Sequence, residues 1–271
     1  SGRDKIPMDK PKEKLDGLVF IGGDDSNTTA FNLASYFAKE KVSCSVIGVP
    51  KTIDGDLRSE YIQISFGFDT ACKTYVEMIG NISRDILSAK KYYAFIRMMG
   101  RSASHITLGC ALMTQPNLAI ISEEKPTLKE VVGQIVNLIK DRAKVGKNYG
   151  VILLPEGLIE AIPDFTFTKE MDPHGNLKVS QIETERFLID LVKKEVEVSP
   201  LPFFLGYEGR SAMPSNFDAN YGYALGLMAA LAVDVEANGH ICTLQKLNRP
   251  AKEWSVTLVP IVQMIEGSVV K

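Results

Sequence analysis

The chain has 271 residues, of which 45% are hydrophobic and 24% charged, and its formal net charge is −2 at pH 7. This composition is typical of a globular protein with one large or two medium domains. The small net charge gives no extended field for nucleic acid or an anionic membrane, so neither is expected as a partner. Because no apolar run approaches the length of a bilayer span and the first residues are polar, we expect a cytoplasmic protein.

The cysteines and histidines point away from metal and nucleophile chemistry. Four cysteines lie far apart without any C-x-x-C pair, and Cys44 and Cys110 stand in apolar runs. Reduced, buried thiols are therefore expected rather than a disulfide or a zinc site. His105, His174 and His240 suggest no metal triad, and no Ser/His/Asp arrangement stands out.

Strand and helix patterns alternate along the chain, which predicts an α/β fold with parallel sheets and helices on both faces. Between residues 162 and 178 the pattern breaks down. Asp25 or Ser26 is the expected cap of the first helix, and Ser102 of the third. The predicted strands cover residues 17–21, 43–49, 92–98, 118–121, 151–154, 203–205 and 255–262. The predicted helices cover residues 26–39, 66–88, 102–113, 127–139, 181–196 and 218–238.

Polar, glycine-containing loops follow the first two predicted strands. Residues 22–28 read GGDDSNT, and residues 51–56 read KTIDGD. Neighbouring parallel strands would place both loops at the same carboxyl edge, where α/β folds bind ligands. Carboxylates, an ammonium and close-approach glycines suit a metal-chelated phosphate and a group that needs deprotonation, as in phosphoryl transfer. Two ordinary polar turns are the alternative for either loop alone.

The residue types in these loops allow specific roles. Asp24 could hold a hydrated magnesium ion against phosphate oxygens, or it could cap the following helix. The start of that helix would direct amide groups at a ligand over Gly23. Asp56 is more plausible as an orienting or metal-side carboxylate than as a base.

Together with later motifs, these loops resemble the phosphofructokinase family, in particular its long-type, pyrophosphate-dependent branch. The matching segments occur in family order, namely GGDDSNT, PKTIDGD, Lys91-Tyr92, MGRSASH at 99–105, Pro155-Glu156-Gly157 and GYEGRSAMPSNFD at 206–218. The resemblance implies two doubly wound, Rossmann-like lobes with the active site between them. Residues 1–66 and 218–271 would form the pyrophosphate and magnesium lobe, and residues 67–217 the fructose 6-phosphate lobe. The family's glycine-rich first loop and its C-terminal extension are expected to lie outside this sequence.

The implied reaction is a magnesium-dependent, glycolytic transfer of a phosphoryl group from pyrophosphate to the 1-hydroxyl of fructose 6-phosphate. By this resemblance, Asp54 is the base that accepts the hydroxyl proton, and Thr52 bonds the sugar or the incoming phosphate. Arg101 would stabilise the transferring phosphoryl group, since its planar donors can bridge phosphate oxygens. Arg3 is implied as a phosphate-contacting arginine.

Sugar binding is implied for a second set of residues. Met99 would form an apolar wall, Gly100 would allow backbone approach, and Glu156 would accept hydrogen bonds from sugar hydroxyls. Tyr207 and Arg210 match the family's clamp on the 6-phosphate. Lys91 and Tyr92 match positions that, in the family, reach across a subunit interface to the sugar phosphate of the neighbouring subunit. The resemblance therefore implies a homodimer or a higher homo-oligomer.

The donor is implied by Asp25 and Lys51, because ATP-using relatives usually carry glycine at both positions. A carboxylate at Asp25 would repel a nucleotide's inner phosphate, and the Lys51 ammonium would neutralise charge on the leaving phosphate. The alternatives are an ATP-dependent 6-phosphofructokinase and a catalytically silent regulatory subunit. A broader rival is another kinase with a G-G-D-G-type loop, against which PKTIDGD and GYEGRSA argue.

Overall fold

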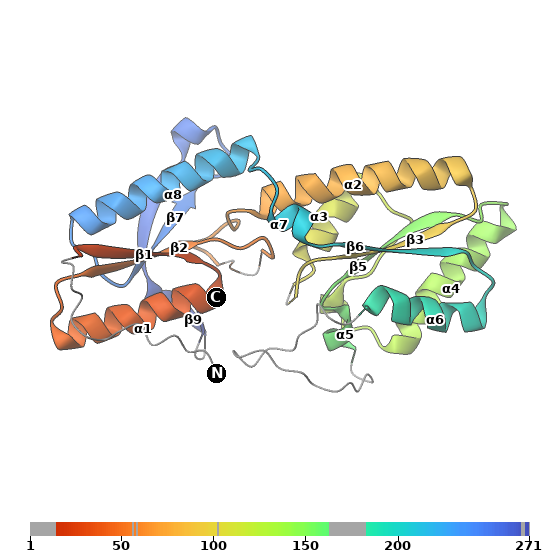
Figure 1. Ribbon diagram of the computed structural model, residues 1–271, viewed down its shortest axis with the longest axis horizontal. Helices are drawn as coiled ribbons and strands as arrows, with labels where there is room; N and C mark the ends of the chain where they lie inside the picture. Colours follow the sequence, from red (N-terminus) through yellow and green to blue (C-terminus); the bar gives the residue numbers. More distant parts are fainter. Residues whose placement is uncertain are drawn as a thin grey trace. The chain divides into compact units, whose positions relative to one another are not determined.

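The computed structural model describes residues 15–55, 57, 59–101, 103–162, 183–266 and 269–270. The chain divides into two compact units. The first unit consists of Ser1–Asp69 and Pro214–Lys271, and the second of Thr70–Met213. Each unit contains a sheet covered by helices (Figure 1), so the predicted α/β fold with parallel-rich sheets is confirmed. The boundaries lie a few residues from the expected ones at positions 66 and 218.

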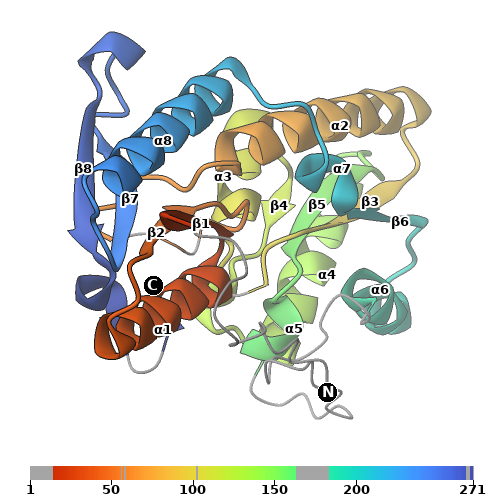
Figure 2. The ribbon, with the colours of Figure 1, turned by 60° about the vertical axis from the view of Figure 1, so that its left-hand side comes forward.

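The first unit is built on a four-stranded sheet of order β1-β2-β7-β8. β1, β2 and β7 run parallel, whereas β8 pairs antiparallel with β7. Helices α1 and α8 cover opposite faces of this sheet (Figure 2). The elements are β1 (Gly17–Gly22), α1 (Asp24–Glu40), β2 (Ser45–Pro50), α8 (Asn216–Asp234), β7 (His240–Gln245), η3 (Ala251–Glu253), β8 (Ser255–Pro260), η4 (Ile261–Met264), β9 (Ile265–Glu266) and β10 (Val269–Val270).

The central strand β2 shows why this unit has two apolar layers. Successive strand residues point to opposite faces, and β2 is buried on both. Val46 packs with Ala30 of α1, whereas Ile47 packs with Leu225 of α8. A nearly continuous apolar strand is what a parallel sheet between two helical layers requires.

The second unit has a parallel sheet of order β4-β5-β3-β6. Phe95 of β3 and Leu154 of β5 belong to the core formed with α4 and α6. Figure 1 shows α2 and α3 over the other face of the sheet. The elements are α2 (Phe68–Ala89), β3 (Tyr93–Met98), α3 (His105–Thr114), β4 (Leu118–Ala119), η1 (Ser122–Glu124), α4 (Leu128–Lys144), β5 (Gly150–Pro155), α5 (Leu158–Ala161), α6 (Thr184–Glu195), β6 (Pro200–Leu205) and α7 (Tyr207–Arg210).

Several helix starts and one strand differ from expectation. α1 begins at Asp24 with the extended Gly23 in the N-cap position and no side-chain cap, so neither Asp25 nor Ser26 caps it. Ser104 rather than Ser102 occupies the N-cap position of α3. Strand β7 was not predicted, because its sequence HICTLQ mixes polar and apolar residues without a clear period. In contrast, the helix predicted to begin at Thr127 is present as α4, and Thr127 caps it in a full capping box with Glu130.

The remaining expectations concern cysteines and membrane spans. All four cysteines are free thiols; three are buried and Cys44 is partly exposed. In the described part of the chain, no helix combines the length and the apolar character needed to cross a membrane. The break in pattern at residues 162–178 lies almost entirely outside the described residues, as do Arg3, Asp56 and Ser102.

Candidate active site

In the first unit, the two predicted loops leave adjacent strands at the same edge. β1 and β2 are parallel neighbours with Gly22 opposite Pro50. The backbone N–H of Lys51 donates to the carbonyl of Gly22 at 2.8 Å. A Cβ added at Gly23 would lie 4.0 Å from that of Thr52. The loops after β1 and β2 are therefore in contact at the carboxyl edge, where this fold class binds ligands.

Gly23, Asp24 and Asp25 lie at the start of α1. The Asp25 N–H donates to Asp24 Oδ1 at 2.9 Å, and the Asp25 side chain is exposed. Free amides and the helix dipole at this end favour a bound anion such as phosphate. The two carboxylates oppose that preference unless a cation accompanies the anion, which makes a metal-chelated phosphate a better fit than a bare one.

The donor set fits magnesium held jointly with a phosphate ligand. The described residues contain no group of three or more His, Cys, Asp or Glu side chains that could hold a metal by themselves. Mg²⁺ usually keeps several waters and binds through one or two carboxylates plus substrate phosphates. Asp24, partly exposed at the loop, can supply such a carboxylate.

The second loop carries Lys51, Thr52 and Asp54. It is tied to the segment before α2, because the Thr52 N–H donates to the Phe66 carbonyl at 3.2 Å. The Asp54 N–H donates to Thr52 Oγ1 at 3.2 Å, which fixes Asp54 relative to the strand end. One carboxylate oxygen of Asp54, Oδ1, is buried. A carboxylate held this way can accept a proton from a neighbouring hydroxyl.

In the second unit, three adjacent strands end at one level. Met98 of β3 lies opposite both Pro155 of β5 and Leu205 of β6. The residues that follow these strands therefore meet at the carboxyl edge. The predicted residues that gather there are Met99, Gly100, Arg101, Glu156, Tyr207 and Arg210.

Two glycines shape the backbone at this edge. Gly100 has a positive φ of 128°, which side-chain-bearing residues rarely adopt. A Cβ on Gly157 would lie 2.0 Å from the carbonyl oxygen of Arg101, so only glycine allows this approach. The Gly157 N–H also donates to the Gly100 carbonyl at 3.2 Å. The loop bearing Arg101 is therefore packed directly on the loop bearing Glu156.

Sequence reasoning did not find Glu160, an acid on α5 near this edge. Burial raises the pKa of Glu160; the Arg101 guanidinium opposes this rise and the Glu156 carboxylate adds to it. Arg101 and both acids thus influence one another electrostatically. Glu160 stands four residues after Glu156, but Glu156 precedes α5, so helical spacing in PEGLIE could not have indicated that the two acids lie near each other.

Tyr207 and Arg210 lie on the single-turn helix α7. The Arg210 guanidinium is 5.6 Å from the centre of the Tyr207 ring, and Tyr207 is 68% exposed. An exposed arginine beside a tyrosine can bind a phosphate through paired hydrogen bonds.

Lys91 and Tyr92 do not join this set within the chain. They precede β3, whereas Met99 and Arg101 follow it, so they lie at the opposite, amino edge of the same sheet. The Lys91 ammonium lies 5.0 Å from the centre of the Tyr92 ring. Within this sheet, Lys91 and Tyr92 therefore lie apart from Met99 and Arg101.

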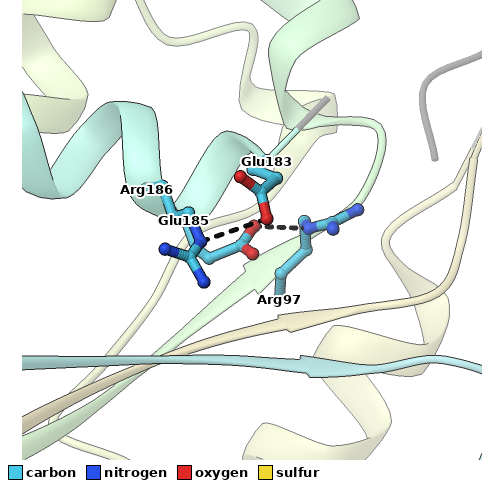
Figure 3. Close-up of polar contacts among 4 residues, drawn as sticks. All are labelled: Arg97, Glu183, Glu185 and Arg186. Atoms are coloured by element: carbon cyan, nitrogen blue, oxygen red, sulfur yellow. Dashed lines mark hydrogen bonds and ion pairs between the residues drawn. The ribbon is translucent and has the colours of Figure 1, made fainter. Parts of the chain in front are cut away.

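A buried ion pair lies deeper in the second unit (Figure 3), and sequence reasoning did not find it. Arg97 of β3 donates through Nε to Oε2 of Glu185 in the first turn of α6 at 2.5 Å. Its guanidinium stacks 3.9 Å from the centre of the Phe204 ring on β6. Arg97 therefore connects β3, β6 and α6 two residues before Met99.

Comparisons with known proteins identify the family of the chain. A model of the family described as Phosphofructokinase matches residues 1–233. A pyrophosphate–fructose 6-phosphate 1-phosphotransferase of Entamoeba histolytica is 43% identical over 93% of this chain and 58% of its own length. The beta 2 subunit of the same-named enzyme of Arabidopsis thaliana is 44% identical over 94% of this chain and 57% of its own.

The fold has solved counterparts. The crystal structure of a pyrophosphate-dependent phosphofructokinase from Nitrosospira multiformis matches with a TM-score of 0.71 at 20% identity. The match covers 91% of this chain and 59% of that one. This chain thus spans less than two thirds of the length of these relatives.

Proposed function

The chain belongs to the phosphofructokinase family, and we propose that it transfers a phosphoryl group from pyrophosphate to the 1-hydroxyl of fructose 6-phosphate. The observation that carries the proposal is the contact between the two loops of the first unit. Asp24 and Asp25 begin α1 after β1, and Lys51 and Asp54 follow the neighbouring strand β2, which supports a shared donor site at this edge. The names of the relatives at 43–44% identity support the choice of substrates.

Pyrophosphate is favoured over ATP by the charges of that edge. Asp25 is an exposed carboxylate at the first turn of α1, where a longer nucleotide would have to place its inner phosphate. Repulsion between the two negative charges disfavours ATP without affecting the shorter donor. The Lys51 ammonium would neutralise the charge that builds on the leaving phosphate.

The chemical step follows from these positions. The 1-hydroxyl oxygen of the sugar attacks one phosphorus of pyrophosphate, and the bond from that phosphorus to the bridging oxygen breaks, releasing phosphate. The hydroxyl proton passes to Asp54, which lies after β2 with its backbone held by Thr52. Mg²⁺ bound with the donor at Asp24 would offset the charge of the phosphate oxygens.

The second unit would hold the sugar. Arg101 would contact the transferring phosphoryl group, Glu156 the sugar hydroxyls, and Tyr207 with Arg210 the 6-phosphate. Met99 and Gly100 would form the wall beside the sugar. Because Lys91 and Tyr92 lie at the far edge of the sheet, we propose that they serve the sugar phosphate of a neighbouring copy in a homo-oligomer.

The deciding experiment is a donor assay on the full-length protein with fructose 6-phosphate and Mg²⁺, comparing pyrophosphate with ATP. We expect turnover with pyrophosphate and little or none with ATP. Asp25→Gly should admit ATP measurably, because the repelling carboxylate is gone. Lys51→Met should impair the pyrophosphate reaction severely. Asp16→Gly is a matched control, since Asp16 lies before β1 at the opposite edge of the sheet.

The outcomes separate the alternatives. Equal use of ATP and pyrophosphate by the wild-type protein would refute the donor argument and favour an ATP-dependent enzyme. Absence of turnover with either donor, despite binding of the sugar phosphate, would indicate a regulatory subunit.

A further inference from the structure

Asn27 is a fully buried polar residue at the first turn of α1, with 0% of its surface exposed. Its side-chain Nδ2 donates to the Gly22 carbonyl at 2.8 Å and to the Gly23 carbonyl at 2.9 Å. The two carbonyls belong to the last residue of β1 and to the residue that joins it to α1. The side chain of Asn27 therefore holds the backbone of the loop from inside the protein.

The same amide also acts on the second loop. The Gly22 carbonyl that accepts from Asn27 accepts from the Lys51 N–H as well, at 2.8 Å. In addition, the Asn27 N–H donates to the Gly23 carbonyl at 3.0 Å. Rotation of the Gly22 or Gly23 peptide would break bonds to both the helix and the Lys51 loop. One side chain thus couples the two loops of the candidate donor site.

Gly48 of strand β2 lies against the side-chain amide of Asn27 and leaves space for it. A Cβ at Gly48 would lie 2.4 Å from Asn27 Oδ1, so any larger residue at position 48 would displace the amide. Asn27 Oδ1 is itself buried, with no hydrogen-bond partner among the described residues. Burying a polar atom in this way lowers stability, so packing alone does not account for an asparagine here.

We propose that Asn27, seated over Gly48, is a positioning residue for the phosphoryl donor. It sets the orientation of the Gly22 and Gly23 peptides, and through them the amides and the Asp24 carboxylate at the start of α1. Asn27 does not touch the donor; it acts through the loop backbone. This inference rests on the proposed function of the same loops and names the residue that fixes their geometry.

The test uses four variants of the full-length protein: Asn27→Ala, Gly48→Ala, the double variant, and Asn220→Ala. Asn220 is a matched control, because its Nδ2 also donates to a backbone carbonyl, that of Asn216, at 2.8 Å, but on the exposed side of α8. For each variant we would measure the Kd of magnesium pyrophosphate by calorimetry, the KM of both substrates, and the melting temperature.

We expect Asn27→Ala to weaken binding of magnesium pyrophosphate by about 10–100-fold, the loss typical when outer-shell partners of a metal site are removed. The KM of fructose 6-phosphate should change little. The double variant is the sharp test, because the Gly48→Ala methyl group partly fills the space left by the amide. It should recover much of the lost melting temperature and none of the lost pyrophosphate affinity. Asn220→Ala should leave both quantities unchanged.

The proposal is overturned if Asn27→Ala binds pyrophosphate as tightly as the wild-type protein does. It is also overturned if the double variant recovers pyrophosphate affinity together with melting temperature. Either result would leave Asn27 a purely structural residue. An error in the proposed donor would give a different pattern of binding from an error in the role of Asn27. If the wild-type protein binds magnesium ATP instead of pyrophosphate, the donor assignment is wrong, and the same variants measured with ATP still test Asn27. If the wild-type protein binds neither donor, both proposals fail.

Discussion

In the first unit, side chains hold the loop after β1, whereas in the second unit a glycine backbone contact joins the loops after β3 and β5. In the first unit, Asn27 bonds the carbonyls of Gly22 and Gly23, and Thr28 Oγ1 bonds the carbonyl of Asp24 at 2.8 Å. In the second unit, the Cα of Gly157 packs against the Arg101 peptide without any side chain between them. Both arrangements fix a loop beside the end of a strand.

The difference shows how each unit should respond to substitution. A loop held by a side chain can lose one hydrogen bond at a time, so its geometry and its stability can be changed separately. A loop held by direct backbone contact admits no such partial change, because any Cβ at Gly157 forces the two segments apart. The variants below test whether catalytic rate, substrate KM and the free energy of unfolding can be changed independently in each unit.

The largest effect is expected for the proton acceptor in the first unit. Asp54→Asn keeps the shape of the side chain but removes the base, so kcat should fall by ~10²–10⁴-fold while the sugar KM changes little. Steady-state kinetics with both substrates varied would measure this split. Turnover close to that of the wild-type protein would remove Asp54 from the role.

The next effect concerns the buried pair of the second unit. Arg97→Met leaves the Glu185 charge buried without its cation and should lower the free energy of unfolding by about 3–5 kcal/mol. The double variant Arg97→Met/Glu185→Leu should recover most of this loss, since two apolar residues leave no uncompensated charge. Urea unfolding followed by circular dichroism would measure each value.

The neighbouring pair in Figure 3 provides the control. Arg186 Nε lies 3.1 Å from Glu183 Oε1, but both side chains are 61% exposed. Arg186→Met should therefore cost less than about 1 kcal/mol. A loss equal to that of Arg97→Met would show that burial is not what makes the inner pair important.

A smaller loss of stability than that of Arg97→Met is expected from the glycine contact. Gly157→Ala should lower the free energy of unfolding by about 1–3 kcal/mol, because the added methyl group meets backbone that cannot rotate away. It should also raise the sugar KM, since the Arg101 loop must move. Gly133→Ala, in the interior of α4 with nothing within 4 Å of the added Cβ, should instead stabilise the protein by about 0.5–1 kcal/mol. A harmless Gly157→Ala would contradict the contrast between the two units.

The sequence was a good guide wherever a local pattern determines the structure. Apolar runs located β1, β2, β3 and β5 to within two residues, and helical spacing of apolar residues placed the start of α4 within one residue. The order of polar loops after strands indicated which residues would gather at each edge. These features depend on neighbours in the chain, which composition and spacing reveal.

Features that depend on distant partners could not be predicted. Arg97 looked like an ordinary polar interruption of a strand, because its partner Glu185 lies 88 positions away. Asn27 looked like one more polar residue in GGDDSNT, since nothing in that motif shows that Gly48 leaves space for an amide. Strand β7 has a weak pattern of its own and is defined by pairing with β2 and β8.

The route of the chain through the first unit has a consequence for folding during synthesis. Its central strand β2 is made early, but the partner β7 follows only after all of Thr70–Met213. For example, the Val46 N–H donates a hydrogen bond to Asn238 Oδ1, and Asn238 is synthesised 192 residues later. The second unit is one continuous segment and can fold as it emerges from the ribosome. The first unit must keep β2, apolar on both faces, unpaired on one side until α8 and β7 arrive. A nascent chain halted after Met213 would thus expose an unprotected strand edge, which makes this interval the point at which a chaperone would matter most.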